Sequence, residues 1–401
     1  MFTIKLDMFQ AAALACLVLL LGRFLVSKIE ILRKYCLPEA VVGGVVFAVL
    51  HLILRGANIA EISFDDTLQT VFMNLFFCSI GFAASFKLIK KGGKLVLIFL
   101  VLSVSVVVMQ NVIGVLSASF FNLPAGLGLA TASIPMVGGH GTAAAFGPMM
   151  EAAGVVGAET AAIAAATFGL VAGCVIGGPI AENVIKKYKL KPNANVFSAE
   201  KTEKKENDDI DSAKFLNAMM LLLLALGAGT IIGKFLSQIV IFGQKLNFPG
   251  YVGAMLAAAV IRNVADKKEI EIEIKEINTI GAFSLSIFLG LAMMGLKLWQ
   301  LAELALPMIA MLVAQTLFMA FAARFICFNV LGKNYDAAVI TAGFCGFGMG
   351  ATPNAMANMQ AVTQKNGPSP TAFLVVPLVG SLFIDLFNST IITLFVSFFV
   401  L

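Results

Sequence analysis

Two glycine-rich segments of similar sequence lie 210 residues apart in a strongly apolar chain. The first covers residues 131–142 and the second residues 341–352, and each begins with Thr-Ala and ends with Thr. Glycine lets the backbone approach a ligand closely, and a helix that starts or stops inside a membrane leaves N–H or carbonyl groups without a partner. N–H groups attract anions, whereas carbonyl and hydroxyl oxygens suit small cations. The segments therefore indicate non-covalent binding of a small anion together with a cation, and we expect no enzymatic chemistry.

From these segments and from polar residues in the last apolar run we predict one binding site. The predicted substrate-binding residues are Gly138, Gly139, His140, Gly141, Thr142, Gly348, Gly350, Ala351, Thr352 and Asn354. The predicted Na⁺ ligands, which offer oxygen atoms, are Thr131, Ser133, Thr341, Thr352, Asp385 and Asn388. The alternative interpretation is that the glycines only allow tight packing between helices.

Several polar side chains lie inside apolar runs, where they are costly and therefore candidates for function. For Asp385, one turn before Asn388, we favour a role as cation ligand or gate over a structural hydrogen bond. For His140 we favour a hydrogen bond that fixes its segment over direct substrate contact, and no second His or Cys lies nearby to suggest a metal site. Hydrogen bonds between helices are the favoured role of three amides, Gln110, Asn111 and Gln315.

The composition excludes a soluble fold. The 401 residues are 59% hydrophobic and 13% charged, with a mean hydropathy of +0.94, whereas soluble domains are typically ~45–50% apolar. Because each helical crossing needs ~20 apolar residues, the apolar runs predict an all-α polytopic membrane protein with ten transmembrane helices. The predicted spans are 8–26, 37–54, 67–86, 95–121, 158–185, 213–243, 249–264, 277–296, 300–328 and 370–400.

The two halves are predicted to be inverted repeats. Matches at an offset of 210 or 211 recur beyond the glycine-rich segments, for example Lys87 with Lys297 and Gly169 with Gly380. Five spans per half is an odd number, so the second half must enter the membrane in the opposite sense. We expect each repeat to carry a re-entrant hairpin, and the two tips to meet near the midplane. The predicted units are 1–188 with hairpin 124–156, a linker at 189–211, and 212–401 with hairpin 334–362.

The distribution of basic residues predicts the orientation. With both termini outside, all but five of the 28 Lys and Arg residues fall in inner loops, as the positive-inside rule requires; the exceptions are Lys5, Arg55, Lys234, Lys245 and Lys297. The linker 189–211 is then cytoplasmic, and the net charge of +5 reflects topology and not a nucleic-acid partner. The six cysteines show no Cys-x-x-Cys spacing, so we expect them to pack as small apolar residues.

Five stretches carry a resemblance to a known family. Residues 138–142 (Gly-Gly-His-Gly-Thr) and 346–353 (Gly-Phe-Gly-Met-Gly-Ala-Thr-Pro), with 294–299, 332–338 and 373–377, resemble the bacterial sodium/glutamate symporters, the glutamate:sodium symporter family. The resemblance implies Na⁺-coupled uptake of L-glutamate by an elevator-like movement between scaffold and substrate-carrying domain. It also implies a homodimer in the bacterial inner membrane, surrounded by lipid, with Na⁺ as coupling ion and no other cofactor.

Coupling energetics favour more than one Na⁺. A glutamate anion that enters against an inside-negative potential costs ~2.3 kcal/mol per 100 mV, and one Na⁺ cancels only that electrical cost. At least two Na⁺ would make uptake electrogenic and strongly concentrative.

Other transport classes remain as alternatives. Val137 stands where the family commonly has Ser, Phe344 where it has His, and Asn354 where it often has Thr. A sodium/dicarboxylate or hydroxycarboxylate symporter would use the same paired hairpins, although no arginine lies in 334–362 to bind a further carboxylate. An ion channel is disfavoured, because its filter loops would enter around one axis from the same side.

Overall fold

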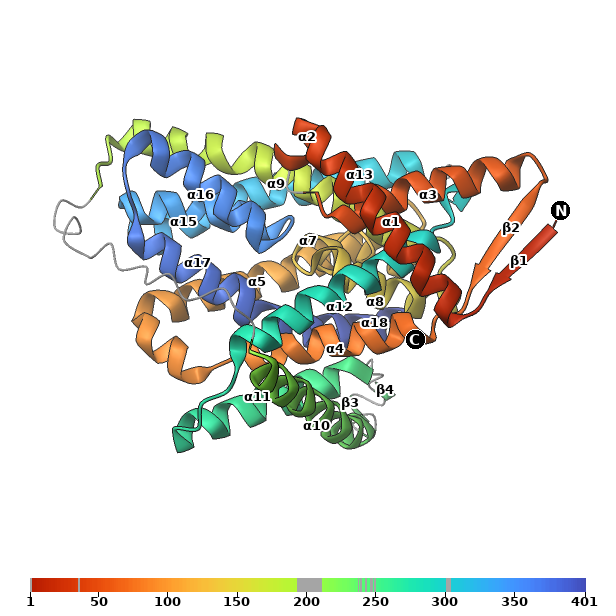
Figure 1. Cartoon of the computed structure of the whole chain (residues 1–401). Coiled ribbons are helices and arrows are strands. Elements are labelled where there is room, and N and C mark those ends of the chain that lie inside the picture. Colours follow the sequence, from red (N-terminus) through yellow and green to blue (C-terminus); the bar gives the residue numbers. More distant parts are fainter. Residues whose placement is uncertain are drawn as a thin grey trace.

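In the computed structural model the chain is a bundle of helices with two small two-stranded sheets (Figure 1). The structure describes residues 2–34, 37–192, 211–236, 238, 240–241, 244–245, 248, 250–300 and 304–401. Most of the predicted linker 189–211, and part of the end of the predicted span 213–243, lie outside these residues.

The first half contains nine helices and two strands within the described residues. They are β1 (Phe2–Leu6), α1 (Met8–Lys28), α2 (Glu30–Lys34), α3 (Glu39–Gly56), β2 (Ala60–Phe64), α4 (Thr67–Ala83), α5 (Phe86–Phe120), α6 (Ala125–Leu129), α7 (Ser133–Met136), α8 (Gly139–Ala152) and α9 (Ala158–Tyr188).

The second half follows a similar order in the residues that the structure describes. Its elements are α10 (Ser212–Leu236), β3 (Val240–Ile241), β4 (Gln244–Lys245), α11 (Gly250–Lys268), α12 (Ile274–Met294), a 3-10 turn (Leu298–Gln300), α13 (Ala305–Phe321), a π-helical segment (Ala322–Cys327), α14 (Phe328–Val330), α15 (Tyr335–Gly348), α16 (Thr352–Asn366), α17 (Pro370–Leu382) and α18 (Ile384–Phe399).

Local sequence signals account for several helix ends. Asp7 accepts hydrogen bonds from the N–H groups of Phe9 and Gln10, both at 2.9 Å, and so caps α1. Asn334 accepts from the Ala337 N–H at 2.8 Å and caps α15 in the same way. Proline stands in the first turn of α16 and of α17, where its missing N–H costs no hydrogen bond.

Eight helices in the described part of the chain are long and apolar enough to span a membrane, against ten predicted. A polytopic, nearly all-helical membrane protein is thus confirmed, but the count is not. The helices at the predicted spans 67–86 and 249–264 are not among the eight. α4 has only 17 residues, and α11 carries four charged residues in its last two turns.

The structure adds one detail to the predicted fold and corrects another. The predicted span 370–400 is one of the eight, at Pro370–Phe399, and its helix is divided at Phe383 into α17 and α18. The chain is also not purely helical, because β1 pairs in parallel with β2 and β3 pairs with β4. The β1–β2 pair ties the segment before α1 to the connection between α3 and α4 (Figure 1).

The helices pack as two bodies. The six-helix body contains α1, α3, α4, α10, α11 and α12, which pack chiefly on one another. The break-containing body consists of α5 to α9 and α13 to α18, in which α9 packs on α8, α15 and α16, and α5 packs on α6, α13, α17 and α18. Fewer contacts join the bodies, among them α8 with α12 and α18 with α11. Figure 1 shows α10 and α11 beside α4, and α15 and α16 together with α9.

The two halves share a close helix crossing. A Cβ on Gly43 of α3 would lie 2.0 Å from the carbonyl oxygen of Val18 in α1. A Cβ on Gly253 of α11 would lie 2.2 Å from the carbonyl oxygen of Gly229 in α10. Only glycine permits so close an approach, and the two contacts stand at the offset of 210 or 211 residues found in the sequence.

Candidate functional site

Two helix breaks meet inside the break-containing body. Gly139, at the start of α8, has φ +62°, a backbone conformation that favours glycine. A Cβ on Gly139 would lie 3.1 Å from the carbonyl oxygen of Gly350, in the break between α15 and α16. The glycine-rich segments that the sequence singled out, 210 residues apart, are therefore in direct contact.

The breaks bring together helix ends of opposite polarity. α8 begins at Gly139 and α16 begins at Thr352, whereas α15 ends at Gly348. The first turns of α8 and α16 present N–H groups and the positive ends of their dipoles, and the last turn of α15 presents carbonyl oxygens. This arrangement can hold an anion and a cation near one another.

Three glycines of α9 let α15, α16 and the break between them pack directly on that helix. A Cβ would fall 2.2 Å from the Met349 carbonyl oxygen if placed on Gly169, and 3.0 Å from the Cys345 carbonyl oxygen if placed on Gly173. On Gly177 it would fall 2.2 Å from Nδ2 of Asn358. The close fit that the packing interpretation predicts is therefore present along α15 and α16, and at Gly169 it occurs at the break itself.

Side chains of α16 fix the second break to its neighbours. Asn354 Nδ2 donates to the carbonyl oxygen of Leu170 at 2.8 Å, and Asn358 Nδ2 donates to that of Gly173 at 2.9 Å. Thr352 Oγ1 donates to the carbonyl oxygen of Gly380 at 3.0 Å. The first turns of α16 are thus hydrogen-bonded to α9 on one side and to α17 on the other.

A second group of polar residues surrounds the start of α7. Ser133 Oγ donates to Asn111 Oδ1 at 3.0 Å, and Asn388 Nδ2 donates to the Ser133 carbonyl oxygen at 3.2 Å. All three residues are buried. Asp385 stands half-buried in the first turn of α18, just after the interruption at Phe383. The structure therefore places Ser133 and Asn388 together, from segments far apart in the chain.

His140 contacts α9 by the hydrogen bond that the sequence favours. Its Nε2 lies 2.9 Å from Oγ1 of Thr167, and the imidazole is buried. Thr142 is also buried, against Gly138, where an added Cβ would come within 2.4 Å of its side chain. Gly141 faces Phe76 of α4 and Leu285 of α12, so this end of α8 lies at the boundary between the two bodies.

Two of the predicted Na⁺ ligands point elsewhere. Thr131 donates to the Gly128 carbonyl oxygen at 2.9 Å and contacts Met311 of α13. Thr341 donates to the Ala337 carbonyl oxygen at 2.8 Å and contacts Cys327 of the π-helical segment. The described contacts of both hydroxyl groups are with the preceding turn of the chain and with a sulfur atom of a neighbouring helical segment, and not with Gly139, Gly350 or the start of α16.

The amides that the sequence assigned to interhelical hydrogen bonds do make them. Gln110 Nε2 of α5 donates to the Gly348 carbonyl oxygen at 2.8 Å, and Gln315 Nε2 of α13 donates to the Gln110 carbonyl oxygen at 2.9 Å. Sequence reasoning did not connect them to the breaks. It also missed Thr167, which bonds to His140 and has no distinguishing sequence signal of its own, and it identified Gly380 only as a repeat match of Gly169 and not as the acceptor of the Thr352 hydrogen bond.

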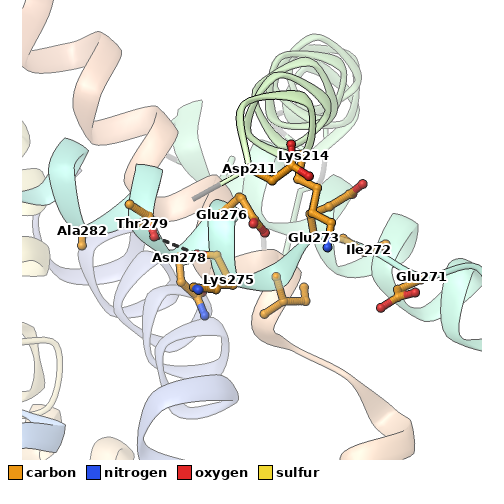
Figure 2. Close-up of a pocket in the computed structure, with 11 residues that line it drawn as sticks. Asp211, Lys214, Glu271, Ile272, Glu273, Lys275, Glu276, Asn278, Thr279 and Ala282 are labelled. Carbon is orange, nitrogen blue, oxygen red and sulfur yellow. Dashed lines mark hydrogen bonds between the residues drawn. The ribbon is translucent and has the colours of Figure 1, made fainter. Parts of the chain in front are cut away.

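A polar cavity of about 1140 Å³ lies apart from this site, where the N-terminal ends of α10 and α12 adjoin (Figure 2). Asp211 and Lys214 of the α10 end and Glu273, Glu276 and Asn278 of the α12 end line it. Its described lining contains none of the predicted site residues. The breaks, and not this cavity, therefore carry the candidate site.

Broken helices that meet in a strongly apolar bundle define a class: polytopic membrane proteins with a binding site built from helix ends, as in many secondary transporters. The chain belongs to the sodium/glutamate symporter family, whose model matches residues 4–368. It is 42% identical over 396 residues to the sodium/glutamate symporters of Escherichia coli (strain K12) and of Shigella flexneri, with 97% of each chain covered. It is 40% identical over 395 residues to that of Haemophilus influenzae (strain ATCC 51907 / DSM 11121 / KW20 / Rd), with 96% of each chain covered.

Proposed function

We propose that the protein is a secondary active transporter that couples uptake of L-glutamate to entry of Na⁺ across the bacterial cytoplasmic membrane. The observation that carries the proposal is the contact of the two breaks, Gly139 against Gly350, in a member of this family. Relatives at 40–42% identity over nearly the whole chain bear the name sodium/glutamate symporter. No observation favours the dicarboxylate, hydroxycarboxylate or channel alternatives over this assignment.

In the proposed site the substrate carboxylates lie at the starts of α8 and α16. The N–H groups there carry the positive ends of two helix dipoles, and no fixed positive side chain is required. His140 positions the α8 end through Thr167, and Thr352 and Asn354 position the α16 end through Gly380 and Leu170.

A Na⁺ site is proposed at the start of α18. Asp385 supplies a carboxylate, and Asn388 supplies an amide oxygen that has no hydrogen-bond partner among the described residues. Ser133 and Thr352 are the further oxygen donors of the proposed set. Thr131 and Thr341 are left outside it, because the described contacts of their hydroxyl groups are with Gly128, Met311, Ala337 and Cys327 and not with Ser133, Asn388 or the helix ends at the breaks.

The proposed mechanism is elevator-like, with the break-containing body carrying substrate past the six-helix body. The division into two bodies and the apolar boundary at Gly141 support it. We further propose that the halves are inverted repeats with re-entrant hairpins at 124–156 and 334–362, in agreement with the glycine contacts that recur at Gly43 and Gly253. We also propose that both termini lie outside the cell membrane, that the linker 189–211 is cytoplasmic, and that the protein is a homodimer.

Uptake of radiolabelled L-glutamate into proteoliposomes tests the function. With an inward Na⁺ gradient we expect accumulation well above equilibrium, and with choline in place of Na⁺ only equilibration. Correctly inserted protein that accumulates no glutamate with Na⁺ would refute the substrate assignment, and accumulation that is equal in choline would refute Na⁺ coupling.

Asn354 and Asn358 offer a matched test of the proposed tip. They lie one turn apart on α16 and both donate to α9 carbonyl groups, but only Asn354 has a buried carbonyl oxygen without a partner among the described atoms. We expect Asn354→Leu to lower the affinity for glutamate or Na⁺ about tenfold or more. Asn358→Leu removes a similar hydrogen bond and is expected to lower thermal stability with a smaller effect on affinity. Equal changes in apparent affinity, from uptake titrations, would contradict a binding role for Asn354.

A further inference from the structure

Four buried amide side chains close to the helix breaks share one hydrogen-bonding pattern. In each, the amide nitrogen donates to a backbone carbonyl oxygen, and the amide oxygen is buried without a partner among the described residues. The four bonds are Gln110 to Gly348, Gln315 to Gln110, Asn354 to Leu170 and Asn388 to Ser133. Because a backbone carbonyl can only accept, the orientation of each amide is fixed and the free atom is its oxygen.

Buried polar atoms in proteins are nearly always partnered, and inside a membrane no lipid group can serve as the partner. Amide oxygens are neutral, hard ligands that suit Na⁺. Four such oxygens, on α5, α13, α16 and α18, are more than the proposed site uses. Asn354 and Asn388 already belong to the proposed site, whereas Gln110 and Gln315 have no role in it so far.

Gln110 and Gln315 form a continuous chain that ends at the carbonyl end of α15. Gln315 on α13 donates to the backbone of Gln110 on α5, and the Gln110 side chain donates to the Gly348 carbonyl oxygen, the last of α15. Both glutamines are fully buried. The C-terminal end of a helix carries partial negative charge, so this location favours a cation and not the substrate carboxylates.

We propose that Gln110 Oε1 and Gln315 Oε1, together with C-terminal carbonyl oxygens of α15, bind a second coupling Na⁺, separate from the ion at Asp385 and Asn388. The inference rests on the proposed function. The charge moved per cycle is the sum of the charges of the transported ions, so a second Na⁺ carried with one Na⁺ and one glutamate anion brings in one net positive charge. Occupancy of this site would make the transport cycle electrogenic.

Substitutions that remove the amide group test this site. Gln110→Met and Gln315→Met keep the length of the side chain but remove the amide oxygen together with the N–H donor to Gly348 or Gln110. Gln110→Glu also loses that N–H donor but retains an oxygen ligand, so it separates the two losses. Ser103→Ala is the control, because Ser103 is equally buried on α5 and its hydroxyl group bonds to Phe99 within that helix. The readouts are the Na⁺ dependence of initial uptake rates and the charge moved per glutamate in proteoliposomes.

We expect both Met variants to raise the half-saturating Na⁺ concentration about tenfold or more, to lower the Hill coefficient for Na⁺ toward one, and to reduce the charge per glutamate by one. Gln110→Glu and Ser103→Ala are expected to keep the steep Na⁺ dependence. For a variant that does not transport, the Na⁺-induced rise in Tm of the purified protein without glutamate is the readout. The Met variants should lose at least half of that rise.

Three outcomes would overturn the inference. The first is a Gln110→Met variant with wild-type Hill coefficient and charge per glutamate, or with an unchanged Na⁺-induced rise in Tm. The second is the same loss in Ser103→Ala. The third is a change confined to the KM for glutamate, which would assign the oxygens to the substrate ammonium group. A wild-type protein whose uptake is independent of Na⁺ would instead refute the proposed function, so the two failures are distinguishable.

Discussion

Replacement of Gly169 by alanine is expected to reduce uptake to below about a tenth of the wild-type rate, whereas the same replacement at Gly178 should leave uptake nearly unchanged. Both glycines lie on α9. A Cβ on Gly169 would be 2.2 Å from the carbonyl oxygen of Met349, within the break between α15 and α16. Among the described residues, apart from its own neighbourhood in α9, no heavy atom lies within 4 Å of a Cβ on Gly178. The clash is with backbone, so α9 and the break must move apart.

Gly169→Ala is expected to lower the stability of the protein and also to displace the helix ends that form the proposed site. Overpacking of a dense interior costs about 1–3 kcal/mol, and the shift occurs where the starts of α8 and α16 meet. Uptake assays and the Tm of the purified protein separate the two effects. A Gly169→Ala variant that folds with a wild-type Tm and transports at the wild-type rate would show that the break does not depend on contact with α9. A loss of similar size in Gly178→Ala would show that the effect comes from lower helix flexibility alone.

A crosslink between cysteines at positions 151 and 297, formed by a bifunctional thiol reagent with a reducible spacer, is expected to stop uptake, and a reductant should restore it. Lys297 Nζ lies 2.9 Å from Glu151 Oε1, and this ion pair joins α8 of the break-containing body to the segment after α12 of the six-helix body. If one body moves past the other, the pair must separate during each cycle. A covalent bond at this position would therefore hold the transporter in one state.

The ion pair between Glu182 and Lys365 supplies the control. Its atoms lie 2.7 Å apart, but α9 and α16 belong to the same body. Both cysteine pairs are introduced into a chain without the six native cysteines, and crosslinking is followed by the shift in gel mobility after proteolysis between the paired positions. The 182–365 crosslink should leave uptake largely intact. Full uptake by completely crosslinked 151–297 protein would rule out relative motion at this contact.

Glycine and proline made the two breaks predictable from the sequence. The start of α8 at Gly139 falls inside the segment 124–156, and the end of α15 at Gly348 falls inside the segment 334–362, the two segments in which the sequence predicted interrupted helices. The interruption at Phe383 gave no comparable signal, because apolar residues surround it and the nearest glycine and proline, Gly380 and Pro377, lie within α17. The short strands β1 and β2 were also missed, since their pairing depends on residues more than fifty positions apart.

The composition of the site was easier to predict than its arrangement. Which helix a side chain faces depends on the rotation of its own helix and on distant neighbours, so the sequence could select Thr131 and Thr341 for their oxygens but not exclude them. The structure directs both hydroxyl groups to carbonyl oxygens of the preceding turn. Gln110 and Gln315 were identified as interhelical partners, but their free oxygens become evident only once the acceptors of their N–H groups are known.

The recurring crossing of α1 with α3 and of α10 with α11 has a consequence for biosynthesis. Each half carries its own glycine contact, Gly43 on Val18 and Gly253 on Gly229, so each pair of helices can associate as soon as it has entered the membrane. The six-helix body is completed differently, because α3 packs on α12 and α4 packs on α11. After synthesis of the first half, the faces of α3 and α4 that pack on α12 and α11 therefore stay uncovered until the second half is inserted. Neither half alone can form the six-helix body.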